Sequence, residues 1–373
     1  MGETDTVIIG ASAAGLATAA CLQRERVPCV LLEQQPHVAG AWRNHYERLH
    51  LHTSKGLSGL PFVPFPREAP RYPSRAEVIA YLEGYAARLA EPPKFGQRVT
   101  SVRREGEAWI TATEGAQWRS PHVVFATGYT RKPLRPAWPG LDQFGGQLLH
   151  SSEYRTGAGF STKRVLVIGF GNSGGEIAID LCEHGAHPTL AVRSAVNIVP
   201  RDFLGIPILA WGIALSVLPT PVADAISRLV SLLVVGRAEK LGLRQLPYGP
   251  MAQIRGDRRI PLLDIGTVER IRRGQIAVMP GVESFTPGAA RFANGEERAF
   301  DAVILATGYR PALAELLQAA DGVLDDHGTP RESGCETLPG LYFCGFNVAP
   351  TGMLREIARE ARRIARSIAA SRR

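Results

Sequence analysis

The chain has 373 residues, of which 45% are hydrophobic and 21% charged, and this ordinary globular composition excludes fibrous and disordered classes. A chain of this length is expected to form two or three domains. The formal net charge of +8 is concentrated in residues 355–373, where seven arginines and two glutamates predict one C-terminal helix. Because no nucleic-acid-binding motif accompanies this charge, we expect no nucleic acid partner.

The cysteines predict neither a redox-active disulfide nor a zinc site. They are Cys21, Cys29, Cys182, Cys335 and Cys344, and no two of them have the C-x-x-C spacing. A disulfide reductase needs such a pair beside its flavin, so that activity is not expected. Since the first predicted strand begins at Thr6, we expect no signal peptide, a cytoplasmic location and reduced cysteines.

Residues 6–33 have the order of a dinucleotide-binding unit. An apolar strand leads into the turn Gly10-Ala-Ser12-Ala-Ala-Gly15 and then into an alanine-rich helix. The second strand ends in Glu33, 18 residues after Gly15, where an acid hydrogen-bonds a ribose hydroxyl. The N–H groups at the start of the helix are expected to meet the pyrophosphate. Ser12 replaces the middle glycine, so its Cβ holds the backbone farther away while its hydroxyl can donate a hydrogen bond.

A second unit of the same kind begins at residue 164. Its turn has all three glycines of the G-x-G-x-x-G pattern, Gly169, Gly171 and Gly174. The following strand, residues 189–192, ends in Arg193, where an NAD-binding site has an acid. An arginine at this place suits the 2′-phosphate of NADP, although an arginine that is merely solvated at a strand end is the alternative.

An apolar segment follows the second unit. Residues 203–223 contain no charge over 21 positions, which is about the length that spans a bilayer. Prolines interrupt the run at 207, 219 and 221, so we expect no spanning segment. Instead we predict a pair of apolar helices within residues 203–235 that cover a core or a ligand channel. A peripheral membrane contact or a homodimer contact is the alternative.

Two similar apolar strands each end in Ala-Thr-Gly-Tyr, at residues 122–129 and 301–311. This repetition predicts an α/β fold with two Rossmann-like dinucleotide-binding domains, the second inserted into the first. The expected FAD-binding domain comprises residues 1–155 and 285–373, and the expected NADPH-binding domain comprises residues 156–284.

The sequence resembles the flavin-containing monooxygenases, and most closely their plant YUCCA-type branch. The family fingerprint F-x-G-x-x-x-H-x-x-x-Y is formed by Phe144, Gly146, His150 and Tyr154. Tyr154-Arg155 stands where Baeyer–Villiger monooxygenases have Trp-Pro or Trp-Asp, which argues against that sister class. Gly40-Ala-Trp-Arg43 resembles the flavin-side motif of the family. Further matches lie at residues 46–55, 60–66, 72–73, 81–85, 199–202 and 262–266.

The resemblance implies the cofactors and the reaction. FAD lies along the first domain and NADPH along the second, and the nicotinamide meets the flavin across the cleft. Dioxygen adds at C4a of the reduced flavin, and the resulting peroxide delivers one oxygen atom to a small-molecule substrate. In the YUCCA-type branch the substrate is an aromatic 2-oxo acid, indole-3-pyruvate, which loses carbon dioxide. Oxygenation at nitrogen or sulfur of a small nucleophile is the alternative.

The expected catalytic residues are Asn172, His52 and Lys55. Asn172 opens the second helix, where its amide reaches the nicotinamide or flavin, or alternatively caps the helix. His50 and His52 alternate along residues 49–53 and face one side of a predicted strand, and two histidines without a nearby acid or cysteine predict no metal. Lys55 matches a lysine of the family; a surface charge is the alternative.

A buried substrate carboxylate needs a cationic partner, for which Lys55, Arg48 and Arg201 are unranked candidates. The expected cofactor-binding residues are, in chain order, Gly10, Ser12, Gly15, Glu33, Gly40, Trp42, Arg43, Val99, Ala126, Thr127, Gly128, Gly169, Gly171, Asn172, Ser173, Gly174, Arg193, Ser194, Ala306, Thr307, Gly308, Tyr309 and Gly345.

Overall fold

The first domain is built on a five-stranded sheet in the order β22-β23-β7-β2-β3. The computed structural model describes residues 1–318 and 321–372. The strands of this sheet are β2 (Thr6–Ile9), β3 (Cys29–Leu32), β7 (His122–Phe125), β22 (Glu336–Leu338) and β23 (Leu341–Phe343), of which only β22 runs antiparallel to its neighbour. The strands β2, β7 and β23 are buried along their whole length, as expected for parallel strands covered on both faces.

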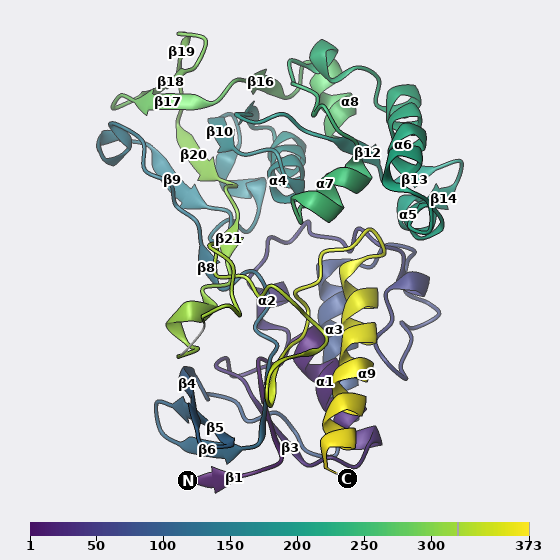
Figure 1. Ribbon diagram of the computed structural model, residues 1–373. Helices are drawn as coiled ribbons and strands as arrows, with labels where there is room; N and C mark the ends of the chain where they lie inside the picture. The colour runs from purple at the N-terminus through teal and green to yellow at the C-terminus, as the bar shows by residue number, and fades with distance from the viewer. Residues whose placement is uncertain (319–320, 373) are drawn as a thin grey trace.

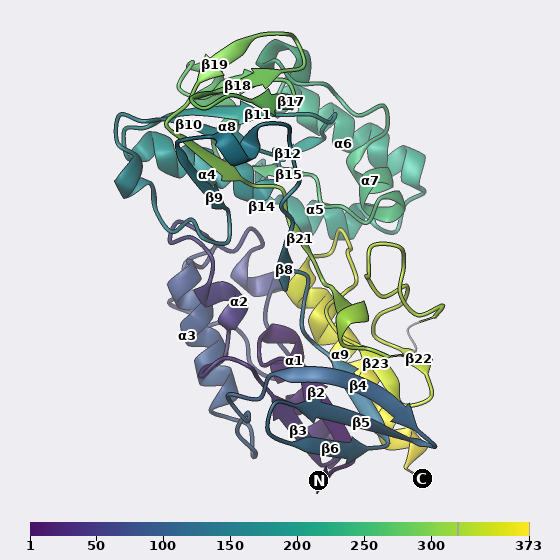
Figure 2. The ribbon, with the colours of Figure 1, turned by 90° about the vertical axis from the view of Figure 1, so that its left-hand side faces the viewer.

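Helices cover one face of this sheet and a second sheet covers the other (Figures 1 and 2). On the helical face, α1 (Ala13–Arg24), α3 (Arg75–Ala86) and the C-terminal α9 (Met353–Ser371) share one apolar core. On the opposite side lies the sheet β1-β6-β5-β4, formed by β1 (Gly2–Glu3), β4 (Val99–Glu105), β5 (Ala108–Thr113) and β6 (Gln117–Ser120). The predicted C-terminal helix is confirmed, and it buries Ile357, Ile364 and Ile368 against α1.

The second domain repeats this plan with a parallel sheet in the order β16-β11-β10-β20-β9. Its strands are β9 (Gln147–His150), β10 (Arg164–Ile168), β11 (His187–Ala191), β16 (Ala277–Met279) and β20 (Ala302–Leu305). The helix α4 (Asn172–Glu183) packs on one face with α8 (Thr267–Arg272), and the antiparallel strands β17 (Val282–Phe285), β18 (Ala289–Phe292) and β19 (Glu297–Ala299) share a core with the other. The predicted class, two Rossmann-like domains with the second inserted into the first, is confirmed.

The strand pairing places the domain boundaries at other residues than the sequence predicts. Both β9 and β20 hydrogen-bond within the second sheet, whereas boundaries at residues 155 and 285 assign these strands to the first domain. The chain crosses between the lobes at β8 (Lys132–Pro133) and returns at β21 (Tyr309–Arg310), and these two strands pair with each other. We therefore place the boundaries at β8 and β21. A short apolar strand that ends in Ala-Thr-Gly-Tyr completes either sheet equally well, so its sequence alone does not identify its partner.

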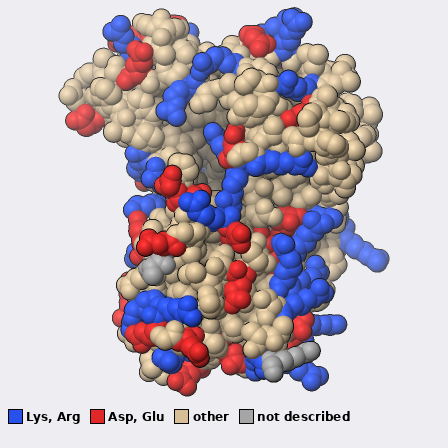
Figure 3. Space-filling view, viewed as in Figure 1, with Lys and Arg blue, Asp and Glu red and all other residues tan. Residues whose placement is uncertain are grey.

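The apolar segment forms the predicted pair of short helices, α5 (Ile208–Leu215) and α6 (Thr220–Val234). Pro219 separates them, and Pro221 lies in the first turn of α6, where a missing N–H costs nothing. Among the described helices, none combines the length and the mean hydropathy needed to cross a membrane. The surface over these helices carries few charged side chains (Figure 3).

The remaining elements connect these layers. They are the helices α2 (Gly40–Arg43) and α7 (Pro250–Gly256), the strand pairs β12 (Ile198–Pro200) with β15 (Leu262–Asp264) and β13 (Asp202–Phe203) with β14 (Ile206–Pro207), and 3-10 helices at Lys55–Leu57, Leu141–Gln143, Gly157–Phe160, Ala238–Leu241 and Leu313–Glu315.

Candidate functional site

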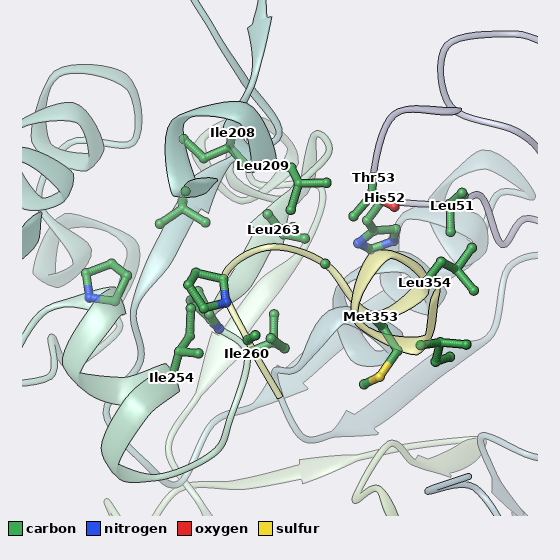
Figure 4. A pocket seen from close by; sticks show the side chains of 18 of the residues that line it. Leu51, His52, Thr53, Ile208, Leu209, Ile254, Ile260, Leu263, Met353 and Leu354 are labelled. Atoms are coloured by element: carbon green, nitrogen blue, oxygen red, sulfur yellow. The ribbon is translucent and has the colours of Figure 1, made fainter. Parts of the chain in front are cut away.

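A cavity of about 570 Å³ lies between the two domains. The first domain contributes the start of α1, the turn after β7 and the residues that enter α9, whereas the second domain contributes α5, α6, α7 and β15. Figure 4 shows the first-domain residues Leu51, His52 and Thr53 on one side of this space and Ile208 and Ile254 of the second domain on the other. Most of the wall is aliphatic, which is typical of a site for an apolar small molecule.

The first glycine turn has the close packing that its sequence predicts. Gly10 has a φ of 102°, which favours glycine, and a Cβ on Gly15 would lie 1.8 Å from the carbonyl oxygen of Gly10. Ser12 stands at the N-cap of α1 without a side-chain capping bond and lines the cavity with Ala13 and Ala14. The start of α1 therefore presents N–H groups and a free hydroxyl to the cavity.

Glu33 lies beside this turn and fastens it. Its buried carboxylate accepts hydrogen bonds from the N–H of Ala11 at 2.7 Å and of Gln35 at 2.9 Å. A carboxylate can accept about four hydrogen bonds, so Glu33 retains capacity for ribose hydroxyls.

The other expected first-domain residues divide into two groups. Trp42, Ala126, Thr127, Gly128 and Gly345 line the cavity, and within the described part of the chain the buried hydroxyl of Thr127 has no hydrogen-bond partner. In contrast, Gly40, Arg43 and Val99 do not line it. The Arg43 guanidinium is paired with Glu83, and Val99 is buried behind the sheet with Val7 and Leu32.

The second glycine turn is packed in the same way but is more open. A Cβ on Gly174 would lie 2.1 Å from the carbonyl oxygen of Gly169, whereas a Cβ on Gly171 would meet nothing within 4 Å. Ser173 is half-buried on the first turn of α4. Arg193 and Ser194 are exposed after β11, where an anionic group can approach them.

Residues 306–309 lie at the return crossing rather than at the cavity. The Thr307 hydroxyl donates to the carbonyl of Leu134 at 2.5 Å, and the Gly308 carbonyl is 3.1 Å from Nε2 of His150. Tyr309 of β21 pairs with Pro133 of β8 and makes an edge contact with His150. Ala306, the remaining member of this group, packs against the second core.

Asn172 is not the cap of its helix, so that alternative is wrong. The N-cap of α4 is Gly171, and Asn172 instead accepts a hydrogen bond at its Oδ1 from the N–H of Leu263, at 2.9 Å. This bond fastens the start of α4 to β15, whose Leu263 lines the cavity.

The two histidines of residues 49–53 are not on one strand face, contrary to the prediction. This segment forms a loop in which only His50 makes an isolated bridge, with Ser74. His50 is exposed, and its Nδ1 lies 2.6 Å from the carbonyl of Arg48. His52 is turned the other way, lines the cavity, and places its Nε2 in contact with Glu176.

None of the three candidate cations for a substrate carboxylate lines the cavity. The Lys55 ammonium donates to the backbone carbonyls of Arg67 and Ala69 and closes the loop between them. Arg48 donates to both carboxylate oxygens of Glu183, at 2.8 and 3.0 Å.

Arg201, the third candidate, is also engaged. Its guanidinium lies over the Tyr72 ring at 4.2 Å from the centroid, and its Nε lies 3.5 Å from the Asp202 carboxylate. In the described part of the chain, the lining of the cavity includes neither lysine nor arginine.

Glu176 is the site residue that the sequence reasoning missed. It lies on the buried side of α4 with 1% of its surface exposed, and its Oε2 has no hydrogen-bond partner among the described residues. The signal in the sequence was a glutamate directly before the apolar Ile177 and Ala178, at a position that faces the core.

Known proteins are similar to this chain in sequence over most of its length. The sequence profile described as flavin-binding monooxygenase-like matches residues 4–320. Indole-3-pyruvate monooxygenase YUCCA1 of Oryza sativa subsp. japonica is 38% identical over 354 residues, which cover 91% of this chain and 86% of that protein. The probable indole-3-pyruvate monooxygenase YUCCA4 of Arabidopsis thaliana is 38% identical over 349 residues, covering 91% and 84%.

The fold is similar to a solved structure over its full length. A flavin-containing monooxygenase from Stenotrophomonas maltophilia matches with a TM-score of 0.76 and 28% identity, covering 100% of both chains.

Proposed function

This chain belongs to the flavin-binding monooxygenase-like family, and from that premise we propose that it is a cytoplasmic monooxygenase that uses FAD and NADPH to decarboxylate an aromatic 2-oxo acid oxidatively. Indole-3-pyruvate is the substrate that we name for this class. Dioxygen supplies the oxygen atom, and the products are the aryl acetic acid and carbon dioxide. The enzyme class follows from the family, and the substrate is our proposal.

The residues around the two glycine turns fit the two cofactors. When bound, FAD and NADPH supply the electrons that activate dioxygen. On the FAD side, the N–H groups of α1 and the Ser12 hydroxyl hold the pyrophosphate, Glu33 receives the ribose, and the unpartnered hydroxyl of Thr127 is free for a polar group of the ring. On the NADPH side, the open N-terminus of α4 holds the pyrophosphate and the exposed Arg193 receives the 2′-phosphate.

The observation that carries the substrate proposal is the aliphatic cavity at the meeting of the two domains. Its walls from α5, α6 and α7 are suited to a flat aromatic ring, because burying such a ring removes apolar surface from water. The same walls exclude water from the reacting atoms. The two relatives named for indole-3-pyruvate support an indole as the ring.

One observation favours a second candidate, oxygenation of a small nucleophile at nitrogen or sulfur. Such a substrate needs no carboxylate partner, and the described cavity wall has neither lysine nor arginine.

Product analysis tests the proposal. Indole-3-pyruvate, phenylpyruvate, a tertiary amine and a thioether are supplied separately to the flavin-loaded enzyme under air with NADPH and catalase. We expect stoichiometric carbon dioxide and aryl acetic acid from the oxo acids. An N-oxide or sulfoxide, without decarboxylation above a control with hydrogen peroxide alone, overturns the proposal in favour of the second candidate.

A further inference from the structure

The proposed substrate brings a carboxylate into a cavity whose described wall has two imidazoles as its candidate cations. The first is His45, and burial, together with the nearby Arg155 and Arg75, lowers its pKa to about 4. His45 is therefore neutral at pH 7. The second is His52, which contacts the buried carboxylate of Glu176 across the domain boundary.

The contact with Glu176 determines which nitrogen of His52 remains for a group inside the cavity. A buried carboxylate is costly unless a positive charge or several hydrogen bonds compensate it, and Oε1 of Glu176 meets only the Nε2 of His52 in the described structure. An imidazole that carries both protons supplies that charge and donates through Nε2–H. Its second proton is then on Nδ1, the nitrogen left for a group inside the cavity. A buried carboxylate stabilises an imidazolium in this way in catalytic triads.

The phenol of Tyr46, which lies near Glu176, stays protonated beside this pair. Tyr46 is buried, and its burial and then the charge of Glu176 raise the pKa of Tyr46 well above the ordinary value. Tyr46 thus stays neutral. Arg48, another cation near Glu176, is held outside the cavity by both oxygens of Glu183.

We propose that His52, oriented by Glu176, is the group that binds the carboxylate of the substrate. The Nδ1–H of His52 donates to the substrate carboxylate, and Glu176 acts as a positioning residue behind it. The opposite wall, with Ile208 and Ile254, then receives the aromatic ring (Figure 4). This assignment rests on the proposed function, since it gives the aryl 2-oxo acid the cationic partner that neither lysine nor arginine provides.

The proposal predicts a preference for an anion over its uncharged analogue. The probes are indole-3-acetate, which is the expected product, and indole-3-acetamide, which has nearly the same shape without the charge. Dissociation constants are measured by calorimetry on the flavin-loaded enzyme at pH 7, so the result does not depend on turnover. We expect the wild-type protein to bind the acid at least tenfold more tightly than the amide.

Two variants and one matched control test the role of each residue. Glu176→Gln and His52→Gln should each weaken binding of the acid at least tenfold and change binding of the amide less than twofold. Glu269→Gln makes the same chemical change on α8, outside the cavity, and should alter neither constant. If Glu176→Gln does not retain FAD, His52→Gln decides the result, because the side chain of His52 is partly exposed and a glutamine amide can still donate to Glu176.

Unchanged affinity for the acid in the variants that retain FAD overturns the inference. This failure is distinct from that of the proposed function. If the enzyme decarboxylates indole-3-pyruvate but Glu176→Gln does not change binding of the acid, only the role of His52 and Glu176 is overturned. If His52 binds the anion but the enzyme does not decarboxylate any oxo acid, only the proposed function is overturned.

Discussion

The two nucleotide sites share one backbone geometry but differ in how they are held. In the first, buried carboxylates bind the N–H groups of the surrounding turns: Glu33 accepts from Ala11, and Glu360 of α9 accepts from Gly345 at 2.6 Å. In the second, Gly171 faces open space and Arg193 is exposed. The first site is therefore preorganised by the protein interior, whereas the second is open to solvent.

This difference matches the two tasks that we propose for the sites. A flavin must remain in place through many turnovers, and a rigid, enclosed site keeps it there. A nicotinamide nucleotide must enter and leave in every turnover, and an open site with the exposed Arg193 allows that exchange. If this comparison is right, mutations at the first site affect folding and mutations at the second affect coenzyme choice.

The largest expected effect is that of Gly15→Ala. The new Cβ would lie 1.8 Å from the carbonyl oxygen of Gly10, so the turn between β2 and α1 must deform. We expect a loss of about 3 kcal/mol or more in the free energy of unfolding, measured in urea, together with loss of bound FAD. Gly171→Ala, at the middle glycine of the second turn, is the control without a clash, because its Cβ meets nothing within 4 Å. Equal destabilisation by both changes would show that the clash at Gly15 is not the cause.

The next effect is a pH dependence from Glu360. Burial raises the pKa of this carboxyl from 4.5 to about 7. The folded state therefore holds the proton more tightly than the unfolded state, and stability is lost as the pH rises from about 4.5 through 7. The loss amounts to at most about 3 kcal/mol. Glu360→Gln keeps an oxygen for the Gly345 N–H and should flatten the dependence of the unfolding free energy between about pH 4.5 and 7. A variant with the slope of the wild type would show that another group titrates.

Arg193→Ala should give an effect of similar or smaller size, confined to coenzyme choice. A charge-assisted hydrogen bond to a phosphate contributes about 1.5–3 kcal/mol, so the wild-type enzyme should prefer NADPH over NADH by at least tenfold. The variant should lose most of this preference in kcat/KM for flavin reduction, with unchanged thermal unfolding. The exposed Arg273, which pairs with Glu269 on α8, provides the control variant Arg273→Ala. Equal use of both coenzymes by the wild-type enzyme would show that Arg193 is merely a solvated residue at the end of a strand.

The sequence predicted the glycine turns because their requirements are local. Gly10 and Gly169 need positive φ, and Gly15 and Gly174 need the absence of a Cβ; the motif states both conditions directly. The two-domain class followed from the repetition of that motif. The boundaries did not follow, because the four apolar residues of β20 satisfy either sheet and the choice depends on tertiary packing.

The cavity was harder to predict, because distant residues form it. His52 and Glu176 are 124 positions apart, and no spacing rule connects them. Lys55 and Arg48 carry the charge that a carboxylate requires. Only the folded chain shows that Lys55 already donates to backbone carbonyls and that Arg48 already donates to Glu183. A residue type thus suggests what a side chain can do, and its neighbours decide whether it is free to do so.

The smallest expected effect concerns the exposed side of α6 in the second domain. Leu229 and Leu233 are 58% and 69% exposed, so replacing each with serine should change the unfolding free energy by no more than about 0.5 kcal/mol. Leu209→Ser on the buried side of α5 should cost about 2–5 kcal/mol and serves as the contrast.

Because we expect α5 and α6 to cover the cavity rather than to bind lipid, the wild-type chain should stay in the supernatant without detergent when sedimented with anionic vesicles. Recovery with vesicles, or a dimer that the two serines abolish, would instead assign this face to a membrane or subunit contact.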